Sequence, residues 1–167
     1  PPLFTRSSMD LVEAFNAAKT VELSEPARYI TVKEPVTFGG ERGDFLTFLP
    51  AEKGDRRLRI DCAIDFPTII GQQRIVFDLT PETFSYGAFA RTNASFTQML
   101  MARTIGFFLA DMRNLGYTRK NILIHGKHRY YGESRFVQPN GGKALEPVWH
   151  RATLDLLAAI ALMDGGR

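Results

Sequence analysis

The chain has few of the side chains that form covalent cross-links or mark a catalytic motif. Cys62 is the only cysteine among 167 residues, so an internal disulfide is excluded and the sequence fits a reducing compartment. Because Cys62 lies inside an apolar run, we expect a buried thiol that serves packing. Glycine-rich phosphate loops, nucleophilic serine elbows and paired-cysteine metal motifs are also absent. The residues alone therefore indicate no enzyme class.

Long apolar runs are missing too. The longest stretch near the C-terminus, residues 154–163, is interrupted by Asp155 and is too short to cross a bilayer. No basic-then-apolar leader opens the chain, and we expect a cytoplasmic protein with no membrane span. The chain begins with Pro1 and Pro2 instead of Met, from which we expect a processed, proteolysed or trimmed product.

Charge of one sign is not concentrated in any segment. The net charge is +3 and the pI about 9.2, but the densest basic cluster, residues 56–59, is followed at once by Asp61 and Asp65. This interleaving argues against a nucleic-acid partner. With 44% hydrophobic residues the chain can bury a core. We expect a single domain over residues 1–167, in which residues 1–8 form a flexible leader.

Two hydrophobic periodicities alternate along the chain. A period near 3.6 residues predicts helices, and strict alternation predicts strands. The helices expected on this basis cover residues 9–19, 82–115 and 146–163. The strands expected cover residues 28–32, 35–38, 44–50, 57–66, 74–79 and 121–125, with a strand or hairpin arm at 127–137 and a turn at 139–143. Helices on one face of a mostly antiparallel or mixed sheet give an α+β two-layer sandwich.

Several short sequence segments occur in the same order as in one enzyme family. They cover residues 11–15, 21–23, 28–36, 64–67, 70–73, 80–84, 102–107, 115–116 and 146–151. Together they resemble the second domain of UDP-3-O-acyl-N-acetylglucosamine deacetylases, the zinc amidohydrolases of lipid A biosynthesis. The resemblance implies two similar α+β sandwiches that hold zinc, the acyl chain and the UDP-sugar between their helices. This chain supplies only the second sandwich. The first, which carries a glutamate base and one histidine ligand, has no counterpart in the sequence.

The resemblance points to His150 and Asp155 as metal ligands, although their spacing departs from the family pattern. The family places its His and Asp four residues apart on one helix, whereas these two are five apart. On a regular helix five residues turn by about 140°, so the side chains diverge and Arg151 would pair with Asp155 instead. A one-residue bulge would bring His150 and Asp155 together. The sequence leaves both arrangements open, and zinc binding is expected only with the bulge.

The resemblance also implies catalytic and phosphate-binding positions. Thr104 matches a threonine that helps to polarise the scissile carbonyl, but a second Ala-Arg-Thr phrase makes Thr92 its rival, and either could be an ordinary helix or cap threonine. Arg151 stands where the family has a phosphate-contacting lysine. Ala159 stands where the family has a second Asp, and the family's C-terminal catalytic histidine falls beyond the last residue of the chain.

Two further groups could bind ligands. The resemblance implies that Phe96 and Phe107 line a passage for the acyl chain, although aromatic residues at helical spacing more often pack in a core. Lys127 and Arg129 belong to a cationic, aromatic segment that could stack on a base or hold phosphate, or could simply be an exposed hairpin arm.

Three functions are compatible with these residues. The first is a deacetylase-like domain of the lipid A type that is degenerate and non-catalytic alone, and that binds a UDP-sugar, an acyl ligand or a partner chain. The alternative is half, or a fragment, of an active zinc-dependent deacetylase completed by a missing N-terminal domain. The third is a basic and aromatic interaction module. A lone sandwich should expose its helical face, so we expect a homodimer or a complex with a chain that supplies the first domain. The apolar residues expected on that face are Phe96, Met99, Leu100, Phe107 and Leu156.

Overall fold

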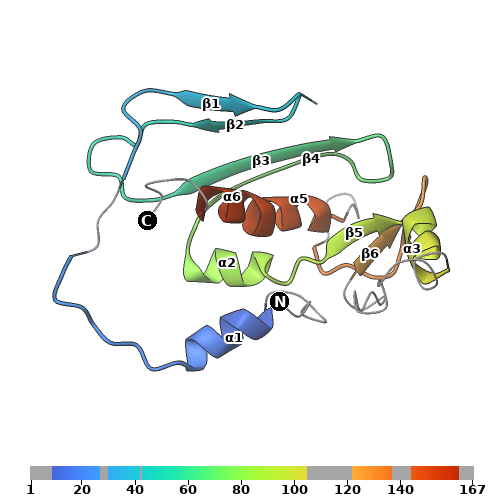
Figure 1. Cartoon of the computed structure of the whole chain (residues 1–167), viewed down its shortest axis with the longest axis horizontal. Coiled ribbons are helices and arrows are strands. Elements are labelled where there is room, and N and C mark those ends of the chain that lie inside the picture. Colours follow the sequence, from blue (N-terminus) through green and yellow to red (C-terminus); the bar gives the residue numbers. More distant parts are fainter. Residues whose placement is uncertain (1–8, 27–29, 42, 105–121, 137–143, 162–167) are drawn as a thin grey trace.

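A long two-stranded ribbon covered on one side by a helix forms the centre of the fold (Figure 1). It is seen in a computed structural model that describes residues 9–26, 30–41, 43–104, 122–136 and 144–161. Strand β3 (Arg59–Phe66) runs antiparallel to β4 (Gly71–Asp78), with Arg59 opposite Asp78 and Phe66 opposite Gly71. The expected strands at 57–66 and 74–79 are therefore confirmed, with β4 starting slightly earlier. The fold is α+β, as the sequence predicts.

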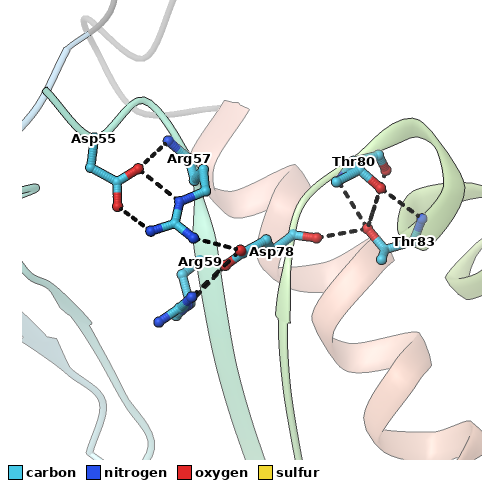
Figure 2. A network of polar contacts seen from close by, with 6 residues as sticks. All are labelled: Asp55, Arg57, Arg59, Asp78, Thr80 and Thr83. Atoms are coloured by element: carbon cyan, nitrogen blue, oxygen red, sulfur yellow. Dashed lines mark hydrogen bonds and ion pairs between the residues drawn. The ribbon is translucent and has the colours of Figure 1, made fainter.

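The two faces of the ribbon have different chemistry. Ile60 and Cys62 are buried beneath the C-terminal helix, since alternate residues of a strand point to the same side. The other face carries ion pairs. Arg57 binds Asp55 at 2.8 Å, and Asp78 lies between Arg57 and Arg59 (Figure 2). Arg57 and Arg59 are thus each paired with a neighbouring carboxylate.

The C-terminal helix comprises three consecutive segments. They are α5 (Glu146–His150), the π-helical η2 (Arg151–Leu156) and α6 (Leu157–Ala161). Val148 and Ala152 pack with the buried residues of β3 in the hydrophobic core. This confirms the helix expected from residue 146. Its last expected residues, 162 and 163, lie outside the part of the chain that the structure describes.

An aromatic cluster fixes the same helix to β4 and to helix α2 (Pro81–Gly87). The Trp149 ring lies 4.8 Å from Phe77 of β4 and 4.9 Å from Tyr86 of α2, measured between ring centroids. Phe136, which is fully buried, lies 4.8 Å from Tyr86. Aromatic pairs at these distances add to the stability gained by burial. Helix α5 is thus held from two sides.

The continuous helix expected over residues 82–115 is wrong. Helix α2 ends at Gly87, β5 (Thr92–Ser95) follows, and a new helix, α3 (Phe96–Arg103), begins with a capping box made by Ser95 and Gln98. Strand β5 pairs in parallel with the fully buried β6 (Ile122–His125). The gain from burying this long-range pairing outweighs the local helical pattern. Residues 105–115 lie outside the described ranges.

The remaining elements flank this framework. Strand β7 (Tyr130–Tyr131) pairs antiparallel with β6 and is much shorter than the arm expected at 127–137. Strands β1 (Val36–Gly39) and β2 (Phe45–Phe48) confirm the strands expected at 35–38 and 44–50, and they pair with each other in a separate hairpin. Helix α1 (Met9–Ala17) confirms the first predicted helix.

Other expectations fail or cannot be compared. No strand forms at residues 30–32, where the Thr31 hydroxyl accepts a hydrogen bond from the Ala51 backbone in a loop contact instead. The predicted leader at 1–8 and the turn at 139–143 fall on residues that the structure does not describe. Within the described ranges, no helix has the length and apolar character needed to cross a membrane.

Candidate functional site

The C-terminal helix widens by one residue at the point where His150 and Asp155 lie. In η2 the backbone hydrogen bonds follow the π pattern, which connects residues five apart. The Nδ1 atom of His150 therefore comes within 3.8 Å of Oδ2 of Asp155. Of the two arrangements that the sequence leaves open, the bulged one is present.

The two side chains differ in exposure. The His150 side chain is 17% exposed and that of Asp155 is 42% exposed. Burial lowers the pKa of His150, while the Asp155 carboxylate acts in the opposite direction. The neutral imidazole that results is the form that binds metals. The pair thus offers one nitrogen and one carboxylate at the edge of the core.

Arg151 competes for the same carboxylate. Its Nη1 atom lies 3.1 Å from Oδ2 of Asp155, the oxygen that also faces His150. The Arg151 side chain is 53% exposed, and exposed pairs at this helical spacing contribute only about 0.3–0.5 kcal/mol. The guanidinium is consequently easy to displace from Asp155. A cation bound beside it would still experience its positive charge.

The first turn of the helix is anchored by a buried ion pair. The Glu146 side chain is 1% exposed. It accepts hydrogen bonds from Nε of Arg91 at 2.7 Å and from the backbone N–H of Arg91 at 2.9 Å. The Ser134 hydroxyl donates to the second carboxylate oxygen at 2.6 Å. These contacts tie α5 to the segment just before β5. The position of His150, four residues after Glu146, is therefore set by tertiary contacts.

The family assignment rests on a sequence comparison over nearly the whole chain. The sequence model of the family described as UDP-3-O-acyl N-acetylglycosamine deacetylase matches residues 1–165. The chain belongs to this family. A comparison with curated proteins gave no match. The family is one of zinc-dependent deacetylases of lipid A biosynthesis, which gives the spacing of His150 and Asp155 a chemical meaning.

The described part of this deacetylase-family chain supplies fewer ligands than hydrolytic zinc requires. Such a site needs three protein ligands and an open position for water. Among the described residues, no three His, Cys, Asp or Glu side chains come close enough together to hold a metal ion. Cys62 packs beneath η2, but burial raises the pKa of its thiol to about 11, so at neutral pH it is protonated. Two converging donors fit one part of a zinc site.

The two Ala-Arg-Thr phrases of the family member occupy different surroundings. Thr92 begins β5, directly after the Arg91 that binds Glu146 on the His150 helix. Thr104 caps the end of α3, where its hydroxyl donates to the Leu100 carbonyl at 2.8 Å. The first phrase is thus the one tied to the candidate ligands. Thr104 performs the ordinary cap role that the sequence allowed.

The other candidate residues lie in separate places. Lys127 and Arg129 are exposed on the turn between β6 and β7, and the Arg129 guanidinium lies 4.7 Å from the centroid of Tyr131. The prediction that Phe96 packs in the core is wrong, since its side chain is 42% exposed. Phe96 is the first residue of α3, and the Ser95 cap determines where this helix begins. Phe107 lies outside the described residues.

Sequence reasoning missed one residue within η2 and one residue of α2 that packs against it. Thr153 is 2% exposed, and its hydroxyl donates to the Trp149 carbonyl at 2.7 Å. Gly87, at the end of α2, is buried against Thr153. The only signal in the sequence was the extra residue between His150 and Asp155. The altered spacing indicates that the helix must accommodate one more residue, but it does not identify the residues that pack against the widened turn.

Proposed function

We propose that this chain supplies half of the site of a zinc-dependent UDP-3-O-acyl-N-acetylglucosamine deacetylase and is non-catalytic by itself. The observation that carries the proposal is the π turn, which brings Nδ1 of His150 within 3.8 Å of Oδ2 of Asp155 despite their altered spacing. A helix that no longer binds metal would not need to keep His150 and Asp155 together after gaining a residue between them. The π turn keeps them together, which favours a retained pair of metal ligands.

The remaining parts of the site come from elsewhere in this proposal. A third ligand and a carboxylate base are needed for hydrolysis, and a second domain or chain would contribute them. When bound, zinc lowers the pKa of its water and polarises the amide carbonyl. The residues of this chain hold the ion through His150 and Asp155 and orient the substrate.

The substrate contacts in this proposal come from the surroundings of the pair and from the positions that the family resemblance suggests. Thr92, next to the anchored Arg91, is the threonine that we assign to the scissile carbonyl, where its hydroxyl would donate a hydrogen bond. Arg151 is exposed beside the metal pair and would bind a phosphate of the UDP-sugar once Asp155 turns to the ion. Lys127 and Arg129 would add a second cationic contact, and Phe96 and Phe107 would contact the acyl chain.

The partner would cover the helical side of the domain. Phe96, Leu100 and Met101 of α3 are 42%, 47% and 57% exposed, whereas Met99 and Leu156 are half-buried. Apolar clusters of this kind often mark interaction sites. A chain that supplies the first domain, or a second copy of this chain, would dock there. We place this assembly in the cytoplasm.

A second candidate is the degenerate domain that binds a nucleotide sugar without catalysis. The ion pair of Arg151 with Asp155 at 3.1 Å favours it, because a guanidinium on the carboxylate replaces the metal there. The two functions differ in one measurable property, which is the affinity of His150 and Asp155 for zinc.

The test is a zinc titration of the metal-free chain in competition with a chromophoric chelator. We expect weak but specific binding that falls at least tenfold in His150→Ala and in Asp155→Asn. His128→Ala is the matched control, because His128 is exposed on the turn between β6 and β7, and its zinc affinity should equal that of the wild type. An affinity that both site variants leave unchanged, or no zinc binding at all, overturns the half-site and leaves the degenerate domain.

A further inference from the structure

The extra residue of the C-terminal helix is held between two neighbouring elements. On one side Ala152, which is 0% exposed, packs with Ile60 and Cys62 of β3. On the other side Thr153 contacts the end of α2 at Gly87. A π turn is rare by comparison with regular helix, so contacts outside the helix must favour it. Thr153 provides the more specific of these contacts.

The hydroxyl of Thr153 lies between two backbone carbonyls. It donates to the Trp149 carbonyl at 2.7 Å, and it also lies 3.2 Å from the carbonyl oxygen of Gly87. Threonine hydroxyls that bond to the carbonyl four residues earlier are known to bend helices. Here the same group connects the widened turn to α2. Its loss would remove the donor from the Trp149 carbonyl, whereas the Gly87 carbonyl would keep the bond from the Ala90 backbone N–H.

The contact depends on the absence of a side chain at Gly87. A Cβ at this position would overlap with Cγ2 of Thr153 and lie 3.0 Å from Cε3 of Trp149. The helix and α2 can therefore approach this closely only with glycine at the end of α2. The bulk of the widened turn fits the space that Gly87 leaves open.

We propose that Thr153 and Gly87 are positioning residues that hold the π turn and thereby pair His150 with Asp155. Without the π turn, five residues of regular helix would turn Asp155 away from His150 by about 140°. The hydrogen bonds of the Thr153 hydroxyl go to the Trp149 and Gly87 carbonyls, so its role is exerted through the backbone. The chemical meaning of the pairing rests on the proposed deacetylase function, whereas the geometric role does not.

An engineered pair of imidazoles tests the geometry without relying on zinc chemistry. In an Asp155→His chain, two imidazoles on the π turn should chelate Ni²⁺, which imidazole ligands suit. Calorimetry should give a Ni²⁺ affinity at least tenfold above that of the same chain with His150→Ala. The affinity should fall at least tenfold when Thr153→Val or Gly87→Ala is added. Thr153→Ser, which keeps the hydroxyl, should retain most of it.

Controls separate positioning from general damage to the fold. Thr97→Val, at an exposed position of α3, should leave the Ni²⁺ affinity unchanged. Circular dichroism should give native helix content for each variant that is compared. Thr153→Ala removes the hydroxyl without adding volume beside Gly87, and it replaces Thr153→Val if that variant does not fold.

The outcomes discriminate the two proposals. Folded Thr153→Val or Thr153→Ala chains that keep the full Ni²⁺ affinity overturn the positioning role. A wild-type chain that binds no zinc, combined with a Ni²⁺ affinity that depends on Thr153, overturns the deacetylase half-site and supports the positioning role. An Asp155→His chain that gains no Ni²⁺ affinity over its His150→Ala control overturns the pairing itself.

Discussion

Glu146 and Arg91 form a buried ion pair that connects the first turn of the His150 helix to β5. The Glu146 carboxylate accepts from the Arg91 side chain at 2.7 Å and 3.0 Å, while the helix itself continues directly to His150. A buried carboxylate that has lost its cation is strongly destabilising because its desolvation is no longer compensated. The pair therefore fixes where the helix begins.

Removal of one partner of this pair should destabilise the protein severely. We expect Arg91→Met to lower the free energy of unfolding by about 3–5 kcal/mol, because it leaves the buried Glu146 charge without its cation. Urea denaturation followed by circular dichroism measures this change. Arg57→Met, at an exposed ion pair on the ribbon, is the matched control and should have a much smaller effect, because water screens exposed ion pairs. Equal effects of the two substitutions would contradict the anchoring role.

The charged face of the ribbon should give a distinct acid response. The Arg57 guanidinium lowers the pKa of Asp55 to about 2, and Arg59 lowers the pKa of Asp78 (Figure 2). Arg74 likewise lowers the pKa of Asp61. A carboxyl whose pKa is lower in the folded state stabilises the protein above its unfolded pKa of about 3.9. That stabilisation is lost as the pH falls through the folded pKa.

The expected pH window thus lies between about 4 and 2. Carboxyl ¹³C NMR should give a titration midpoint near 2 for Asp55. An Arg57→Gln variant should move this midpoint up toward the ordinary value of an aspartate, because it removes the charged guanidinium donors and leaves the bond from the backbone N–H of residue 57. A midpoint near 4 in the wild-type protein would show that the ion pair does not persist in solution.

Local periodicity was enough to predict the elements whose neighbours are close in sequence. Strands β3 and β4 are joined by a short turn and carry alternating apolar residues, and the helix that begins at Glu146 has a clear apolar face. Their positions follow from patterns that the amino-acid order contains directly. The same reasoning correctly predicted that Cys62 is buried.

Elements that depend on distant partners could not be predicted in this way. Strand β5 lies in a stretch of helical periodicity, and it is a strand because it pairs with β6, about thirty residues later in the chain. The π turn depends likewise on Gly87, which is 66 residues away from Thr153. The sequence revealed the altered spacing of the candidate ligands, but their convergence is a tertiary property.

Shortening the helix by one residue should preserve the metal pair by another route. Deletion of Thr153 leaves His150 and Asp155 four positions apart, as in the family pattern, so a regular helix brings them together. The core faces on both sides of the deletion keep their orientation, because the π turn had absorbed the extra residue. We expect a zinc affinity similar to that of the wild type in the same chelator competition. Loss of zinc binding in a folded deletion variant would contradict this account of the spacing.

The exposed apolar residues of α3 should drive self-association of the isolated chain. Leu100 and Met101 are 47% and 57% exposed on a helix that lies beside β5 and β6 (Figure 1). Light scattering coupled to size exclusion should detect a dimer that Leu100→Glu converts to monomer, since a charge in an apolar contact is costly to desolvate. Val76→Glu is the matched control, because Val76 is also an exposed apolar residue, at 56%, but lies between Arg74 and Asp78, which form the ion pairs of β4. A monodisperse wild-type monomer at high concentration would exclude the homodimer and leave the chain that supplies the first domain as the partner for this surface.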